Sequence, residues 1–207
     1  DPFDRSDSSS IGENWGGDTS SYSVSSNALA VGTGNHLILW QDSYGTDQFA
    51  FITMNHVDEN GGGQGIILKS QSPTSASSGD IEAVYDAVNH VVRVMTSAAG
   101  QGQVQRGADI PVTFVDGDQF TARARADGMV EVYRNEQLLG TRDITAWPYY
   151  AQGGYTGLRF VDASDALVDD FGGGTVSSDS TPTVTPTFTF TPTETSTPTP
   201  SFTPTST

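Results

Sequence analysis

The chain lacks cysteine altogether and has a single lysine, Lys69, among its 207 residues. Without cysteine there is no disulfide framework, no thiolate chemistry and no cysteine-ligated zinc site. The basic side chains number 9 against 25 acidic ones, which gives a formal net charge of −16. Such a chain repels polyphosphates and anionic headgroups, so we expect neither a nucleic-acid partner nor an anionic membrane surface.

Long hydrophobic runs are also missing. The longest strongly apolar stretches are Leu37–Trp40 and Ile66–Leu68. A membrane-spanning helix needs about 20 apolar residues, so we expect no such helix. The first residues, beginning at Asp1, do not have the pattern of a signal peptide and are typical of a mature start.

What the chain does contain is alternation of apolar and polar residues, from about residue 20 to residue 171. The predicted strands are 36–41, 48–56, 65–69, 81–86, 90–96, 120–126, 129–134, 137–142, 155–161 and 166–171. About eleven or twelve short strands without helices indicate an all-β, antiparallel, two-sheet jelly-roll sandwich. We assign this sandwich to residues 1–175 and an extended Thr/Pro-rich tail to residues 176–207.

The clearest hairpin joins 120–126 to 129–134 through Asp127 and Gly128. Asp-Gly between two alternating runs predicts a two-residue turn with positive φ at both residues. We therefore expect a tight hairpin here.

Several segments resemble one family. They are Asp1–Arg5, Ile11–Trp15, Gly117–Phe120, Asp127–Asn135, Leu138–Gly140, Gly154–Phe160 and Val168–Phe171. Their pattern is similar to that of the concanavalin A-like (laminin-G-like) jelly-roll domains of bacterial exported proteins. The resemblance implies the sandwich fold, with sugar binding as its default function.

Catalytic signatures are absent from this pattern. β-Glucanases on the same fold use a Glu-x-Asp-x-x-Glu array, because glycoside hydrolysis needs two carboxylates at close spacing. None of the six glutamates begins such an array, and no Gly-x-Ser-x-Gly motif is present. We therefore predict that the chain is not an enzyme.

Exposed aromatic rings would be needed to stack on a sugar. Trp147, Tyr149 and Tyr150 lie between two predicted strands and could form such a platform, as could Trp40 with Tyr44. The alternative is that these rings pack in the core or at its rim.

Calcium is a candidate cofactor, because relatives bind it and oxygen donors are plentiful. Asp116 and Asp118 are the first candidate pair, and the second cluster consists of Asp162, Ser164 and Asp165. The alternative is ordinary turn composition. The histidines, His36, His56 and His90, lie at strand ends without short metal-ligand spacing, and we interpret them as structural.

The tail alternates strictly. Thirteen threonines and one serine occupy the fourteen odd positions from 181 to 207. An extended strand would place these hydroxyls on one face and Val184, Phe188 and Phe190 on the other. The O-glycosylation candidates are Thr181, Thr183, Thr185, Thr187, Thr189, Thr191, Thr193, Thr195, Thr197 and Thr199. The alternative is a disordered, glycosylated linker.

Two functions follow from these features. The main prediction is a non-catalytic extracellular structural subunit, whose tail packs on or between subunits of a homo-oligomer or filament. The rival is a carbohydrate-binding, lectin-like module tethered by a flexible Thr/Pro linker. Both place the protein outside the cell or at its surface, with covalent O-linked glycans on the tail and possible glycan ligands.

Overall fold

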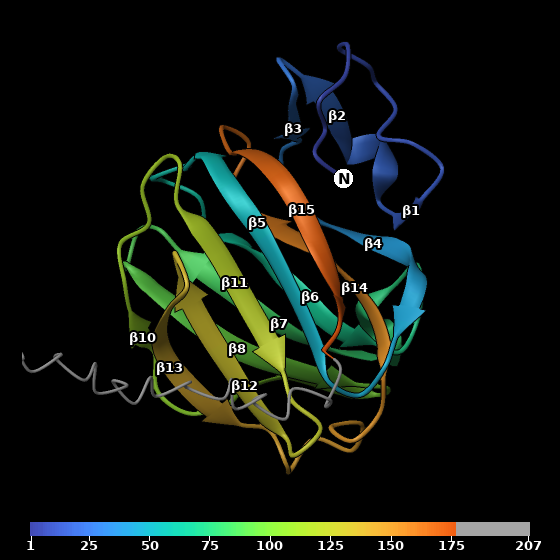
Figure 1. The fold of residues 1–207 in the computed structure, drawn as a ribbon, viewed down its shortest axis with the longest axis vertical. Helices are drawn as coiled ribbons and strands as arrows, with labels where there is room; N and C mark the ends of the chain where they lie inside the picture. The colour runs from blue at the N-terminus through green and yellow to red at the C-terminus, as the bar shows by residue number, and fades with distance from the viewer. Residues whose placement is uncertain (177–207) are drawn as a thin grey trace, which may run out of the picture. The chain divides into compact units, whose positions relative to one another are not determined.

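The computed structural model describes residues 1–176, which form two antiparallel sheets packed face to face (Figure 1). Sheet I has the order β1 (Trp15–Gly17), β4 (Asn35–Tyr44), β14 (Gly154–Val161), β6 (Gly63–Ser70), β7 (Gly79–Asp86), β8 (Val91–Ala98) and β10 (Ile110–Pro111), and β9 (Gln101–Gln105) also pairs with β8. Sheet II has the order β13 (Gln137–Asp143), β12 (Met129–Arg134), β11 (Gln119–Ala124), β5 (Gln48–His56), β15 (Leu167–Thr175), β3 (Ala28–Val31) and β2 (Tyr22–Ser25). The predicted all-β, two-sheet antiparallel class is confirmed.

Helical structure in residues 1–176 is limited to two short 3₁₀ turns, η1 (Thr19–Ser21) and η2 (Ala76–Ser78). None of the helices in this part of the chain is long and apolar enough to cross a membrane.

Each predicted strand is present. The strands 48–56 and 129–134 have the predicted bounds and the others have ends shifted by up to four residues, whereas β1, β2, β3, β9 and β10 were not predicted. β1 and β10 are too short to show a period. β9 is exposed at every residue, so it has no apolar face that could mark it as a strand.

The predicted hairpin exists, but its turn is wider than expected. Arg125 N–H donates to Met129 O, which closes a three-residue loop of Ala126–Gly128. Only Gly128 in this loop has a positive φ, of 86°. The two-residue turn was therefore wrong; loops of three residues typically place one residue, usually glycine, in the left-handed region.

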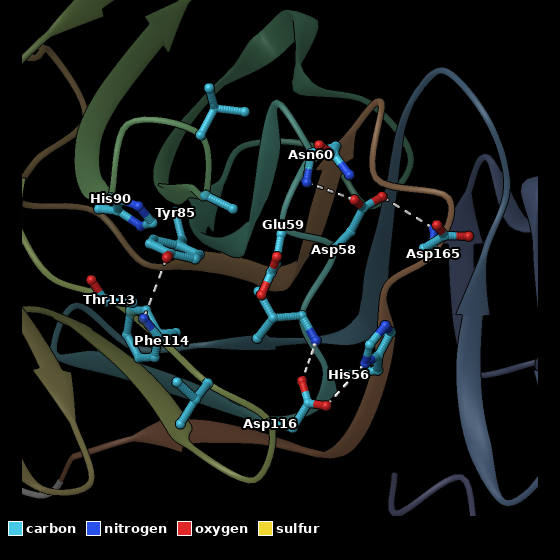
Figure 2. A pocket seen from close by; sticks show the side chains of 14 residues that line it. His56, Asp58, Glu59, Asn60, Tyr85, His90, Thr113, Phe114, Asp116 and Asp165 are labelled. Atoms are coloured by element: carbon cyan, nitrogen blue, oxygen red, sulfur yellow. Dashed lines mark hydrogen bonds and ion pairs between the residues drawn. The ribbon is translucent and has the colours of Figure 1, made fainter.

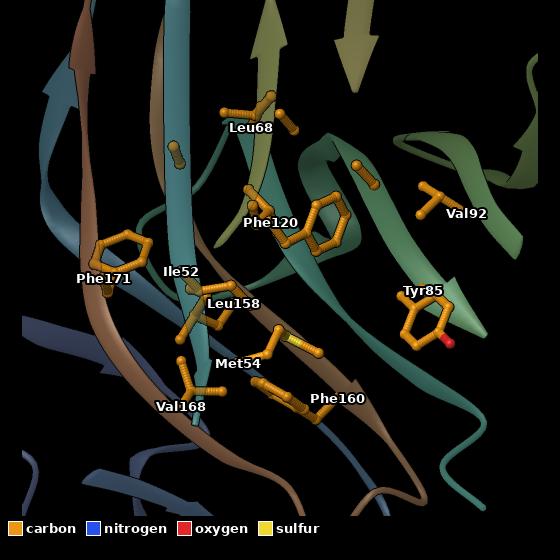
Figure 3. Close-up of a cluster of buried hydrophobic side chains, with 14 of the residues drawn as sticks. Ile52, Met54, Leu68, Tyr85, Val92, Phe120, Leu158, Phe160, Val168 and Phe171 are labelled. Carbon is orange, nitrogen blue, oxygen red and sulfur yellow. The ribbon is translucent and has the colours of Figure 1, made fainter. Parts of the chain in front are cut away.

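The core lies between the sheets, where alternate side chains of both sheets interleave (Figure 3). Sheet II contributes Ile52 and Phe120, and sheet I contributes Leu158 and Phe160, all of them fully buried. Burying each such side chain stabilises the fold by about 1.5 to 3 kcal/mol. This apolar layer fixes the register of the strands that face it, because a slip of one residue would turn their apolar side chains toward water.

Gly157 marks an irregular step of β14, where the register to both neighbouring strands shifts between Tyr155 and Gly157. A Cβ atom at Gly157 would lie 2.9 Å from Leu39 Cα and closer still to the carbonyl oxygen of Ile38. Backbone atoms cannot give way as a flexible side chain can, so this position requires glycine.

Lys69 is buried at the end of β6, at the end of the sandwich where the β11–β12 loop lies. Its Nζ donates to the carbonyl oxygens of Arg125, at 2.9 Å, and of Tyr150, at 2.5 Å. Burial lowers the pKa of Lys69 to about 8, and the charges of Asp47 and Asp127 oppose that shift. The ammonium thus joins two loops at the cost of its own desolvation.

We predict that Gly157→Ala lowers the free energy of unfolding by about 2 kcal/mol, because the new methyl group overlaps backbone atoms of β4. Urea denaturation measures this change. Gly174→Ala is the matched control, since its new Cβ would meet Phe49 at an ordinary contact distance of 3.5 Å. Equal stability of the two variants would contradict the argument.

We predict that the free energy of unfolding rises between about pH 8 and about pH 10 because of Lys69. The pKa is lower in the folded than in the unfolded chain, so the unfolded chain binds more protons in this window. Urea denaturation of wild type and Lys69→Met across the window isolates the effect, which the variant should lack. A variant with the same pH slope as wild type would refute the shift.

Candidate functional site

A cleft of about 950 Å³ opens at one end of the sandwich, where four loops meet (Figure 2). The loops are 57–62 after β5, 87–90 after β7, 112–118 before β11 and 162–166 before β15. The polar lining residues are His56, Asp58, Glu59, Asn60, His90, Thr113, Asp116 and Asp165. We call this feature the end cleft.

The floor of the end cleft is aromatic but buried. Tyr85 and Phe114 pack edge to face, with ring centroids 5.0 Å apart. The Phe114 N–H donates to the Tyr85 hydroxyl at 3.3 Å. At the rim, Val88 and Val115 are 60% and 51% exposed. The cleft therefore combines a buried aromatic floor with two exposed valines among its polar lining residues.

Asp58 holds two of the loops together. Its carboxylate accepts the N–H groups of Asn60, at 2.9 Å, and of Asp165, at 3.1 Å. Gln64 pairs with the Asp58 backbone through both ends of its side-chain amide, at 3.1 and 2.8 Å. Asp58 is therefore a positioning residue that fixes the shape of the cleft, since its oxygens are already engaged.

His56 and Asp116 form an exposed ion pair at one wall, with 3.0 Å between Nδ1 and Oδ2. Asp116 Oδ1 also accepts the N–H of Val57 at 2.8 Å. The hydrogen bond and charge of Asp116 raise the pKa of His56, and the Val57 N–H together with His56 lowers the pKa of Asp116. The pair therefore places an imidazole directly beside a carboxylate at this wall of the cleft.

Among the carboxylate and amide side chains of the cleft three are free, and the exposed side chains of His90 and Thr113 likewise form no hydrogen bond or ion pair within residues 1–176. Within residues 1–176, the side chains of Glu59, Asn60 and Asp165 form no hydrogen bond or ion pair with the protein. All three are exposed. They are hydrogen-bonding groups in fixed loops whose partners must come from solvent or from a ligand.

The predicted aromatic platform is wrong for Trp147. Its side chain is 1% exposed, its indole N–H donates to Ser97 O, and its ring packs edge-on against Tyr149 at 5.4 Å. A ring buried in this way cannot stack on a sugar. Tyr149 and Tyr150 are half-buried beside it and lie outside the end cleft.

The second aromatic candidate also packs on the protein. Trp40 contacts Trp15 edge-on, with ring centroids 5.3 Å apart, and its indole N–H donates to Asp42. Trp15 is buried and its indole N–H donates to the Asp1 carboxylate at 3.0 Å. This cluster attaches the N-terminal segment to sheet I.

The predicted calcium pair, Asp116 and Asp118, does not form a site. Asp116 binds His56 and Val57, whereas Asp118 accepts from Val115 N–H and Asn135 Nδ2 and pairs with Arg134 Nε at 2.7 Å. The Arg134 guanidinium lies against the Asp118 carboxylate, where a calcium ion would have to bind. No group of three or more potential metal ligands occurs in the part of the chain that the structure describes.

The remaining predictions divide between the cleft and the tail. Of the second calcium cluster, Asp165 lines the end cleft, as do two of the histidines, His56 and His90. The tail residues Val184, Phe188 and Phe190 and all threonine candidates for O-glycosylation lie outside the described residues.

Sequence reasoning missed Glu59 and Asn60 as site residues. They stand in a stretch of ordinary turn composition, Asp-Glu-Asn-Gly, which carries no mark of a site. Only the meeting of four loops shows that they face a common cleft.

The sequence matches no protein-family model and no curated protein. Similar solved structures exist. A carbohydrate-binding module, CBM66 from Bacillus subtilis, has a TM-score of 0.60 at 15% identity, covering 80% of this chain and 98% of that one. A structure described with endo-acting O-glycanases of the human gut microbiota that initiate mucin breakdown has a TM-score of 0.59 at 10% identity, covering 86% and 98%. BuGH16Bwt has a TM-score of 0.54 at 8% identity, covering 82% and 79%.

These similarities establish the fold, and they correct the main functional prediction. The similar structures are named as a carbohydrate-binding module or described with glycan-degrading proteins, and not as subunits of a filament. The interpretation as a structural filament subunit is therefore wrong, and the rival carbohydrate-binding interpretation fits the comparisons better.

Proposed function

We propose that residues 1–175 form a non-catalytic carbohydrate-binding module and that the end cleft holds the glycan. The observation that carries this proposal is a set of free polar side chains, which includes Glu59, Asn60 and Asp165, in a cleft of about 950 Å³. Glycan sites need hydrogen-bonding groups in fixed positions to recognise hydroxyls. The Asp58 contacts supply that rigidity.

The charge of the cleft selects a neutral ligand. Neither lysine nor arginine lines it, whereas four carboxylates do, those of Asp58, Glu59, Asp116 and Asp165. A sulfated or uronic-acid glycan would meet like charge, which costs binding energy, and the imidazole of His56 is already paired with Asp116. Carboxylates accept hydrogen bonds from neutral hydroxyls, so an uncharged oligosaccharide fits this lining.

The comparisons support this proposal at the level of the fold. The CBM66 structure is named a carbohydrate-binding module, and the second structure is described with O-glycanases. One fold hosts many functions, so the argument for this chain rests on its own cleft.

The carboxyl groups argue against glycoside hydrolysis. A general acid for this reaction needs a raised pKa, whereas the pKa of Asp116 is lowered by the Val57 N–H and by His56. Burial, together with the charge of Glu82, raises the pKa of Asp80 to about 7. Asp80 is completely buried in sheet I, however, and cannot reach a glycosidic oxygen.

We further propose that the module acts outside the cell and that residues 176–207 are its tether. The support is compositional, since Ser/Thr/Pro tracts are typical of O-glycosylated stalks on exported proteins. O-glycosylation of the tail threonines stays a prediction.

The proposal is tested first on an array of neutral and acidic oligosaccharides and then by calorimetry with the neutral glycan that binds best. We predict that Glu59→Ala and Asp165→Ala each weaken that binding about tenfold, because each removes a charged hydrogen-bond acceptor from the ligand. Both side chains are exposed and without protein partners, so both variants should fold.

Glu13→Ala is the matched control, since Glu13 is an exposed carboxylate outside the cleft, and it should bind like wild type. Three results would each overturn the proposal: no binding to any glycan on the array, a preference for acidic glycans, or unchanged affinity in both Glu59→Ala and Asp165→Ala.

A further inference from the structure

The charged lining of the end cleft consists mainly of hydrogen-bond acceptors. Its four carboxylates accept hydrogen bonds and cannot donate them, and no lysine or arginine lines it. A glycan hydroxyl is donor and acceptor at once, so a cleft that uses both capacities also needs donors. Two imidazoles, those of His56 and His90, lie in the same lining, and the capacity of an imidazole to donate changes near neutral pH.

His56 differs from His90 because a carboxylate holds its ring. Asp116 Oδ2 lies 3.0 Å from His56 Nδ1, whereas the His90 side chain forms no hydrogen bond within residues 1–176. The Val57 N–H and His56 lower the pKa of Asp116, so its carboxylate is ionised near neutral pH and only accepts. Nδ1 of His56 therefore carries a proton in both states of the ring, and Nε2 is the atom that gains or loses one.

Nε2 is the free end of the His56 ring. It forms no hydrogen bond in the part of the chain that the structure describes, and the side chain is 50% exposed. The hydrogen bond and charge of Asp116 raise the pKa of His56, burial opposes this shift, and the charges of Asp165 and Asp58 add to it. Figure 2 shows the ring between Asp116 and Asp165. Carboxylates from two further loops thus act on an imidazole that Asp116 already holds.

The protonation state of His56 decides what Nε2 offers to a ligand. In the imidazolium, Nε2–H is a charged donor, whereas in the neutral ring Nε2 is an acceptor. A hydroxyl can accept from Nε2–H and donate to the Asp165 carboxylate at the same time. Beside a neutral ring, the same hydroxyl would meet two acceptors with only one proton to donate.

We propose that His56 is a specificity-determining residue of the end cleft, which donates from Nε2 to a glycan hydroxyl and weakens its hold as rising pH deprotonates the imidazole. This inference rests on the proposed function of the end cleft and adds regulation by pH to it. Asp116 balances the charge of the imidazolium, so the added donor does not turn the cleft into a site for acidic glycans.

The test is calorimetry with the neutral oligosaccharide that binds most tightly on the array, between about pH 5.5 and about pH 9, where model imidazoles titrate and model carboxyl groups stay ionised. We expect the affinity of wild type to fall about tenfold with rising pH, because a charged hydrogen bond to the glycan is lost. Asp80 and Lys69 also titrate in this window, but neither lines the end cleft and both are kept in every variant.

Two variants change the ring in different ways. His56→Gln removes the titrating group, so its affinity should be equal at both ends of the window. In Asp116→Asn, the Val57 N–H still needs an oxygen at Oδ1, where it now donates at 2.8 Å, so the amide nitrogen faces His56 and donates to Nδ1. The neutral ring then carries its proton on Nε2, and this variant should bind about tenfold more tightly than wild type at the upper end of the window.

His36→Gln is the matched control, since His36 also lies near an aspartate, Asp18, but outside the end cleft. It should keep the pH dependence of wild type. Long-range ¹H–¹⁵N NMR of the imidazoles, recorded without glycan, reads the tautomer directly. The neutral His56 ring should carry its proton on Nδ1 in wild type and on Nε2 in Asp116→Asn.

The outcomes separate this inference from the proposed function. Glycan binding by wild type that does not change with pH, or that falls equally in His56→Gln, overturns the inference and leaves the carbohydrate site in place. A wild-type neutral ring with its proton on Nε2, or an Asp116→Asn variant that gains no affinity over wild type at the upper end of the window, also overturns it. An array on which no glycan binds overturns both proposals.

Discussion

The apolar layer between the two sheets is the constraint on which the rest of this structure depends. Phe120 from one sheet and Phe160 from the other are fully buried there, and the strands that face this layer keep their register because a slip would expose their apolar side chains. A fixed register fixes where each strand ends. The loops that follow those ends therefore meet in the same place in every molecule, and the end cleft has a defined shape.

The polar groups of the protein fall into two sets with different roles. Asp58, Asp118 and Lys69 are engaged with the backbone or with other side chains, and they hold loops in position. Glu59 and Asp165 have no such partners in the described part of the chain and face the end cleft. Loops that carry free polar groups favour recognition of a hydroxyl-rich ligand over catalysis, since the carboxyls with raised pKa values, Asp80, Glu82 and Asp169, lie outside the end cleft.

Much of the fold could be predicted from the sequence, because strand periodicity is local; the runs 48–56 and 129–134 show it over their whole length. The site could not. Trp147 is an aromatic residue of the kind that stacks on sugars, yet tertiary packing buries it. No local feature of the sequence distinguishes a packed ring from an exposed one. Asp116 and Asp118 are close in sequence, but the turn at Gly117 sends their carboxylates to different partners.

The most direct test of the central claim is to map where a neutral oligosaccharide binds on ¹⁵N-labelled protein. The account predicts saturable shifts that include the loops 57–62 and 162–166, which carry the free side chains of the end cleft. Shifts centred on residues 147–150, or saturable binding that leaves both of those loops unperturbed, would contradict it.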